Sequence, residues 1–380
     1  MKARLLGTLA WLCAASAFGC APTMESPTEI QTLRILGVQK DKPYALPGEE
    51  VTLTMLWHDG SIPGEHDVTE DGTPRKVNIV WLGGCLNPPG DAYSGCYEQY
   101  QGAFAADDGM SSASGMASAN AITVGNGPTF TVHIPTDAEN GAPVLHPSAD
   151  PKLPSYGLSY VFFALCAGNV GAGDEHFPIS CADKDGRKLG PDDFVVGYSA
   201  IYFFAPSKDG TPYRNTNPVT DGLHFGPEDV SDATCLSATA DNDCLGGCDE
   251  SGCRNPPPVE VDCTDENPRC VPRCADDGDP NKCPPTNLRL NIESSTFEKD
   301  QVNNDAYGRD YGEQMWIDYY STRGKFHSAT KLLNDATTGY NDVNGTQFYA
   351  PNVPGNVLLW AVIHDNRGGV SWAGTTLSIQ

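Results

Sequence analysis

The residues best suited to chemistry in this chain are closely spaced carboxylates in a cysteine-rich segment. Asp241 and Asp243 flank an asparagine, and Asp276, Asp277 and Asp279 form a second group around a glycine. Calcium takes about six to eight oxygen ligands from carboxylates, amides and the backbone. The pattern therefore makes calcium the best-supported ligand. Solvation of a segment without a core is the alternative, since neither group completes an EF-hand loop.

Cysteine is the second chemically distinctive residue, with fourteen copies. Setting aside Cys13 and Cys20 leaves an even set of twelve, which fits disulfide pairing in an oxidising compartment. Two pairs are local in sequence: Cys85 with Cys96, and Cys166 with Cys181. The remaining eight form one cluster: Cys235, Cys244, Cys248, Cys253, Cys263, Cys270, Cys274 and Cys283. Their connectivity stays open, because the spacing is compatible with many pairings.

Signatures of catalysis are missing from the sequence. The run GYSAI at 197–201 departs from a G-x-S-x-G elbow at its last position, and the eight histidines are scattered without an H-E-x-x-H pair. Cys244 and Cys248 have metal-like spacing, but no histidine falls within the cluster. Because exported thiols oxidise, disulfides are expected there and zinc is not. No catalytic residue is predicted.

Aromatic residues offer a route to binding. One group follows the first local cysteine pair: Tyr93, Tyr97, Tyr100 and Phe104. A second group lies near the C-terminus: Tyr307, Tyr311, Tyr319 and Tyr320. Aromatic side chains are enriched at recognition surfaces, and packing in a core is the alternative for both groups.

The N-terminus reads as an export signal. Two cations precede an apolar run over residues 5–18, which is too short to span a bilayer, and Gly19 stands before Cys20. This region resembles the lipobox of bacterial lipoproteins, which implies cleavage before Cys20 and its acylation, with palmitate as an expected chain. Position 21 is alanine, whereas an aspartate there would imply retention in the inner membrane. The outer membrane is therefore the expected location. Ordinary secretion, with Cys20 as a free thiol or disulfide partner, is the alternative.

Composition limits the partners. The formal net charge is −25, and such an acidic surface repels nucleic acid and anionic lipid head groups. The chain is therefore expected to attach to the membrane through its N-terminal lipid. An envelope protein or a glycan is the expected further partner.

Short alternating runs bounded by Gly, Pro and Asp predict an all-β chain. Such runs occupy 50–58, 77–81, 130–134, 288–292 and 314–320. The runs at 160–166 and 194–205 are longer and read as central strands, and VLLWAVI at 357–363 is apolar on both faces. A loop rich in small residues at 104–127 interrupts the first group of strands.

Five regions follow from these patterns. They are a leader at 1–19, a tether at 20–32, a β-sandwich with long inserts at 33–208, an acidic cysteine-rich spacer at 209–285 and a second sandwich at 286–380. Residues 228–283 hold fourteen acidic and four basic side chains and almost no large apolar ones, so only cross-links could hold them. The expected arrangement is two immunoglobulin-like antiparallel sandwiches, placed as beads on a largely irregular disulfide-rich spacer.

Two stretches resemble a known family. The first reads LRILGVQKDKPYALPGEEVTLTMLW, and the second reads EQMWIDYYSTRGKF followed later by VLLWAVIHDNRGGVSW. Both resemble uncharacterised surface lipoproteins of myxobacteria and related Gram-negative bacteria. The second also resembles bacterial immunoglobulin-like modules of the polycystic-kidney-disease type, with Trp360, Val362, Asp365 and Gly368 at the places of W-x-V-x-x-D-x-x-G. The resemblance implies a fold and an envelope location, and it brings no catalytic residues.

These features predict an envelope-anchored lipoprotein that acts as a non-catalytic binding or scaffolding protein. The alternative is a hydrolase, calcium-dependent and acting on glycans, with a pair of carboxylates that converge in the first sandwich. No cofactor other than calcium is expected.

Overall fold

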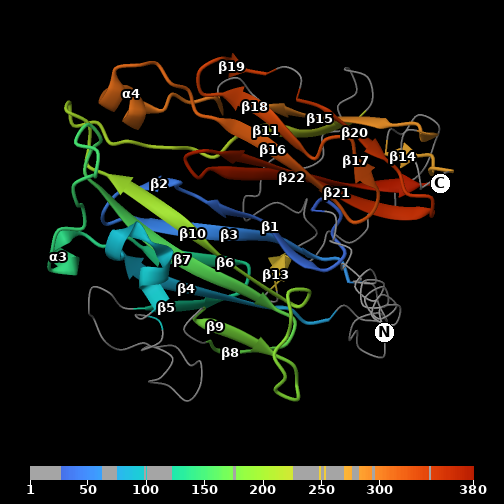
Figure 1. Cartoon of the computed structure of the whole chain (residues 1–380), viewed down its shortest axis with the longest axis horizontal. Helices are drawn as coiled ribbons and strands as arrows, with labels where there is room; N and C mark the ends of the chain where they lie inside the picture. Colours follow the sequence, from blue (N-terminus) through green and yellow to red (C-terminus); the bar gives the residue numbers. More distant parts are fainter. Residues whose placement is uncertain are drawn as a thin grey trace, which may run out of the picture.

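The computed structural model contains two β-sandwiches that lie one above the other (Figure 1). It describes residues 27–61, 75–97, 100, 122–173, 177–225, 248–249, 252–253, 269–275, 282–292, 296–341 and 344–380. The predicted all-β class, with two immunoglobulin-like antiparallel sandwiches, is confirmed.

The first sandwich pairs a three-stranded sheet with a five-stranded sheet. The smaller sheet has the order β1 (Leu33–Lys40), β3 (Glu50–Asp59), β6 (Thr129–His133). The larger has the order β2 (Tyr44–Ala45), β10 (Phe194–Phe204), β7 (Tyr156–Cys166), β4 (Asn78–Leu86), β5 (Thr123–Asn126). All neighbours are antiparallel except β2 and β10.

Apolar and polar side chains alternate along these strands, so one face of each strand lies in a shared core. Val51, Leu53 and Met55 of β3 point inward, opposite Trp81 of β4 and Phe163 of β7. Trp81 is fully buried and donates its indole N–H to the carbonyl of Gly127 at 2.7 Å. This satisfies the polar atom of the largest side chain in the core.

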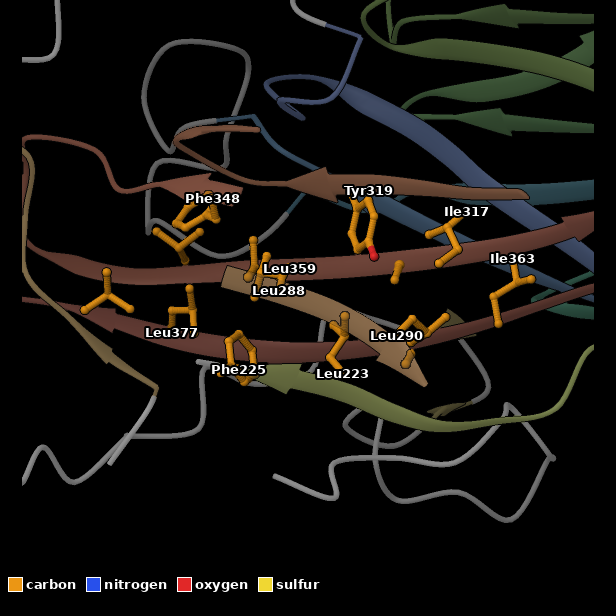
Figure 2. Packing of buried hydrophobic residues seen from close by; sticks show 14 of the residues in the cluster. Leu223, Phe225, Leu288, Leu290, Ile317, Tyr319, Phe348, Leu359, Ile363 and Leu377 are labelled. Atoms are coloured by element: carbon orange, nitrogen blue, oxygen red, sulfur yellow. The ribbon is translucent and has the colours of Figure 1, made fainter. Parts of the chain in front are cut away.

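The second sandwich is built from a four-stranded and a six-stranded sheet. The smaller has the order β11 (Thr220–Phe225), β15 (Thr286–Ile292), β20 (Thr346–Tyr349), β17 (Lys325–Phe326). The larger has the order β14 (Cys270–Val271), β22 (Val370–Ile379), β21 (Gly355–Asp365), β16 (Met315–Ser321), β18 (Thr330–Asp335), β19 (Gly339–Tyr340). Figure 2 shows side chains of both sheets meeting between them.

The remaining elements are short. They are the 3-10 turns η2 (Pro89–Asp91) and η3 (Tyr93–Cys96), the hairpin β8 (Asn169–Ala172) and β9 (Ile179–Ala182), the pair β12 (Cys248–Asp249) and β13 (Gly252–Cys253), and the helices α3 (Asp137–Asn140) and α4 (Gln301–Tyr307). Asp300 caps α4 by accepting from the backbone N–H of Asn303 at 3.2 Å. Among the described residues, no helix is both long and apolar enough to cross a membrane.

Three disulfides lie within the described residues. Cys85–Cys96 and Cys166–Cys181 join the two predicted local pairs, and Cys274–Cys283 joins two members of the cluster. Cys270 is also disulfide-bonded. Cys235, Cys244 and Cys263 lie outside the described residues, and the backbones of Cys248 and Cys253 are paired in the β12–β13 register.

The range predicted as a spacer contributes strands to the second sandwich. Strand β11 pairs with β15 and buries Leu223 and Phe225 in the core, and β14 runs parallel to β22. The reason is that TDGLHF at 220–225 carries two large apolar residues two positions apart, which is the alternation of a half-buried strand. The predicted tether is likewise engaged at its end, because Ile30 N donates to the carbonyl of Ser321 at 2.8 Å.

The two sandwiches are packed directly against each other, and the predicted arrangement as separate beads is wrong. Leu36 of β1 and Leu56 of β3 form one buried cluster with Trp360 of β21 and Trp372 of β22. The ring of His58 lies 4.8 Å from that of Trp360, measured between centroids. In Figure 1 the blue strands β1 and β3 accordingly run beside the red strands β21 and β22. Strand β21 is therefore buried on both faces, as its apolar run predicted.

A polar junction flanks this contact at the turn after β21. Asp365 accepts from the backbone N–H groups of Arg367 and Gly369 at 2.7 and 2.8 Å, and Asn215 donates to both of its oxygens. Arg367 donates to Glu313 at 2.6 Å. Burial raises the pKa of Glu313 to about 7. The motif residue Asp365 thus organises the turn and ties the segment between the sandwiches to it.

Lys40 reaches the same junction from β1. Its ammonium donates to the carbonyl of Ala200 at 2.8 Å, and its backbone carbonyl accepts from Asn217 at 2.6 Å. Burial lowers the pKa of Lys40 to about 8, and the negative charge of Asp365 partly offsets this by raising it. Gly368 has a φ of +91°, a conformation that favours glycine, and a Cβ there would lie 2.7 Å from Lys40 Nζ.

The first prediction concerns the contact between the sandwiches. A Cβ at Gly37 would lie 3.2 and 3.3 Å from methyl carbons of Val362 and Val370. The substitution Gly37→Leu should therefore wedge the sandwiches apart and cost about 1–3 kcal/mol of unfolding free energy. Denaturant unfolding and small-angle X-ray scattering measure the two effects.

Gly190→Leu is the matched control, because a Cβ at Gly190 would meet nothing within 4 Å. It should leave both stability and scattering near those of the parent chain. Equal stability and an unchanged radius of gyration for Gly37→Leu would contradict the packed arrangement.

Candidate functional site

The outer face of the five-stranded sheet presents aromatic rings to solvent. Strand β10 reads FVVGYSAIYFF, so Ile201 and Phe203 point into the core while Tyr198 and Tyr202 point outward. The side chains of Tyr198 and Tyr202 are 46% and 37% exposed. Large aromatic residues exposed on a regular sheet are candidates for recognition, because burying them in a complex removes much apolar area from water.

Register brings matching residues of β7 beside them. Ala200 of β10 pairs with Tyr160, and Phe204 pairs with Tyr156. The rings of Tyr160 and Tyr198 are 5.5 Å apart between centroids, and those of Tyr156 and Tyr202 are 6.4 Å apart. Edge and tilted contacts of this kind fix the ring orientations.

A disulfide-anchored loop completes the surface. Cys85–Cys96 closes the segment that carries η2 and η3, and Asn87 pins its start by donating to Val144 O and accepting from Leu158 N, both at 2.8 Å. This places Tyr93 over the sheet, where its ring stacks on Tyr198 with centroids 4.5 Å apart. We call the five residues Tyr93, Tyr156, Tyr160, Tyr198 and Tyr202 the tyrosine face.

One carboxylate lies within the tyrosine face. Asp91 accepts from the hydroxyl of Tyr156 through Oδ2, and its backbone carbonyl accepts from the hydroxyl of Tyr160 at 2.9 Å. Nε2 of His146 lies 3.5 Å from Asp91 Oδ1 and makes no hydrogen bond to any described residue. Asp91 has a φ of +55°, a left-handed conformation that these contacts hold in place.

The surroundings raise the pKa of three tyrosines of the face. The hydrogen bond to Asp91 raises the pKa of Tyr156 to about 12, and desolvation raises that of Tyr160 to about 12. Desolvation also raises the pKa of Tyr202, with Asp91 contributing. The hydroxyl groups of Tyr156, Tyr160 and Tyr202 therefore stay protonated well above neutral pH, and they can act as both donors and acceptors.

A groove extends this surface toward the junction of the sandwiches. Its volume is about 770 Å³, and residues 151–154 and 205–213 face α4 across it. Tyr213 of one wall donates to Asp305 of the other at 2.9 Å. The ring of Phe204 lies 6.2 Å from that of Tyr202 and 6.1 Å from that of Tyr213, which is buried in a small core cluster beside the groove.

The two predicted aromatic groups contain both exposed and buried residues. Tyr93 is 40% exposed, whereas Tyr100 is fully buried and Tyr97 is half-buried against Phe162. Phe104 lies outside the described residues. In the second group Tyr319 is a core residue, so these tyrosines do not form one surface.

The other predicted site residues are not brought together in the described part of the chain. Cys20 and the proposed calcium ligands lie outside the described residues: Asp241, Asp243, Asp276, Asp277 and Asp279. Within the described residues, no group of three or more His, Cys, Asp or Glu side chains is placed to hold a metal ion. Calcium stays a prediction.

Asp91, His146, Tyr156, Tyr198 and Tyr202 were not predicted as site residues. The available signal was the alternation of β10, which places both of its tyrosines on one face of the strand. The register of β7 against β10 places Tyr156 beside these two tyrosines. The position of Asp91 depends on the conformation of its loop. Neither is visible in one sequence.

Three carboxyl groups of the first sandwich have a lowered pKa. A hydrogen bond from Arg214 lowers the pKa of Glu49, and the backbone N–H of Thr136 lowers that of Glu139 to about 2. The backbone N–H of Lys152 lowers the pKa of Asp150. A glycosidase acid needs a raised pKa. These three carboxyl groups have the opposite shift, and the hydrolase stays a prediction.

Comparisons with known proteins give no family. No family model matches the chain, and no curated protein matches it. Among solved structures, the native E. coli alpha-2-macroglobulin is similar at a TM-score of 0.22 and 9% identity, with 93% of this chain covering 17% of that one. The D0–D1 domain of intimin reaches a TM-score of 0.19 at 11% identity, with 91% and 98% covered. A bacterial ice-binding adhesin reaches 0.18 at 7% identity, with 93% and 66% covered.

The second prediction tests the coupling of Asp91 to Tyr156. The substitution Asp91→Asn removes the negative charge beside the hydroxyl of Tyr156. Deprotonation of this hydroxyl then costs less free energy. The pKa of Tyr156 should fall from about 12 toward the ordinary tyrosine value of about 10. An alkaline titration followed by tyrosinate absorbance measures the shift, and Tyr156→Phe assigns it.

Asp150→Asn is the matched control. It removes a carboxylate that accepts from Tyr307 at 2.7 Å, outside the tyrosine face. It should lower the pKa of Tyr307 and leave the Tyr156 titration in place. A Tyr156 titration that is the same in Asp91→Asn and in the parent chain would contradict the proposed geometry.

Proposed function

We propose that this chain is a lipid-anchored, non-catalytic binding protein of the bacterial cell envelope, and that the tyrosine face is its recognition surface. The observation that carries the proposal is the exposure of Tyr93, Tyr198 and Tyr202 on one sheet face beside Asp91. Tyrosine combines apolar contact area with a polar tip and loses little side-chain entropy on binding.

Rigidity supports a role in recognition. The loop carrying Asp91 and Tyr93 is closed by Cys85–Cys96, and the hairpin β8–β9 is tied to β7 by Cys166–Cys181. Phe177, beside this hairpin, packs on Phe162, which in turn contacts Tyr198. A surface held in one conformation before it meets its partner pays less ordering entropy on binding.

The position of the tether supports an outward-facing site. Ser321 N donates to the carbonyl of Thr28 at 2.9 Å, so the chain that follows the proposed lipidated Cys20 reaches the second sandwich first. Ser321 shortly precedes β17, which Figure 1 places at the opposite end of the long axis from the cyan turns that carry Asp91 and Tyr93. An outer-membrane anchor at Cys20 would therefore leave the tyrosine face directed away from the membrane.

The third prediction tests the recognition surface. The double substitution Tyr198→Ala and Tyr202→Ala, in a soluble chain that begins after Cys20, should weaken binding to isolated envelope material by about tenfold or more. The reason is that both exposed rings are lost while the inward face of β10 is unchanged. Co-sedimentation measures binding, and circular dichroism checks the fold.

Tyr340→Ala is the matched control. Tyr340 is 51% exposed but lies on β19 of the second sandwich, so binding should not change. If the folded double variant binds envelope material as tightly as the parent chain, the tyrosine face is not the recognition surface.

The fourth prediction tests the anchor. Cys20→Ser should abolish incorporation of an alkyne-labelled palmitate and release the protein from the membrane fraction, because the acyl chains supply the attachment. Cys13→Ser, within the leader, is the control and should be labelled normally. Labelling of Cys20→Ser, or its absence from the parent chain, would refute lipid anchoring at this residue.

A further inference from the structure

We infer that the ligand of the tyrosine face is a neutral polysaccharide chain that lies along β10. This rests on the proposed function, because it names the ligand of the same surface. The inference is carried by the layout of the rings, by the polar atoms between them and by the sign of the charge around them.

The rings form an extended track. Tyr198 and Tyr202 are four residues apart on one strand, so their Cα atoms lie about 13 Å apart along it. Tyr93 stacks on Tyr198 at one end with an interplanar angle of 21°, and Phe204 stacks on Tyr202 at the other with an angle of 11°. The groove lies beyond Phe204, with the buried Tyr213 between them. Such a track matches a polymer with repeated contacts better than a compact small molecule.

The polar atoms suit hydroxyl groups. His146 Nε2 lies 3.5 Å from Asp91 Oδ1 and has no hydrogen-bond partner among the described residues, and the Asp91 side chain is partly exposed. A sugar offers C–H faces that pack on aromatic rings and hydroxyls at its rim that can donate to the Asp91 carboxylate. A partner that covered this carboxylate with apolar side chains would instead bury a charge without adding a hydrogen bond, which costs binding energy.

The charge next to the rings disfavours an acidic polymer, although Lys152 and Lys208 line the groove beyond them. The groups that act electrostatically on Tyr156, Tyr160 and Tyr202 are Asp91 and other tyrosines, and none is a lysine or an arginine. The whole chain carries a formal net charge of −25. A polyanion would meet repulsion both at long range and at Asp91. A neutral chain avoids both costs.

The experiment uses polysaccharide purified from the envelope of the source organism and separated by anion exchange into an unretained neutral fraction and a retained anionic fraction. Affinity electrophoresis of the soluble chain should show retardation by the neutral fraction. The Tyr198→Ala, Tyr202→Ala double variant should lose at least about tenfold in affinity, and Asp91→Asn should lose several-fold. Tyr340→Ala should behave as the parent chain.

Treatment of the envelope material separates this inference from the proposed function. Periodate, which cleaves vicinal diols, should abolish binding, and protease treatment should not. Binding that resists periodate and is lost with protease would identify a protein partner, which overturns the polysaccharide and leaves the binding function standing. Retardation by the anionic fraction alone would overturn the inference that the polysaccharide is neutral. Absence of any binding to envelope material would overturn the proposed function itself.

Discussion

The burial of Trp360 and Trp372 against β1 and β3 is the contact on which the rest of this molecule depends. A sandwich needs to bury only one face of each sheet, yet β21 is apolar on both faces. The outer face of β21 can leave water only by packing on another layer. The first sandwich supplies that layer, and Gly37 of β1 allows the close approach. Two sandwiches thereby become one continuous body.

This contact determines which surface remains open. In the first sandwich, the three-stranded sheet turns its outer face to the second sandwich, so its opposite side is the five-stranded sheet. The outer face of that sheet is partly covered by the disulfide-linked loop after β4 and by the hairpin β8–β9. Tyr198 and Tyr202 of β10 stay partly exposed at the edge of this cover, and Tyr93 of the covering loop stacks on Tyr198. The proposed recognition surface therefore combines the exposed tyrosines of the sheet with one ring of the loop.

Much of the fold could be predicted because strand alternation is a local property. The runs at β3, β6, β7, β10, β16 and β21 are observed as strands where the pattern placed them. The run of β21 is apolar on both faces, but the layer that covers its outer face was not predicted. Strand β11 was missed because two apolar residues in six are a weak signal beside an acidic, cysteine-rich segment. The candidate site was less predictable, since only Tyr93 stood in a group singled out in advance.

The sequence by itself determined the strands, the two local disulfides and an acidic composition, because each depends on residue types and short spacings. Only the tertiary structure decided that Tyr93 stacks on Tyr198 and that Asp91 meets Tyr156 and His146. These residues come from β7, β10 and two loops, and their meeting depends on sheet register and loop conformation. Register is a property of paired strands, which a single strand's pattern does not contain.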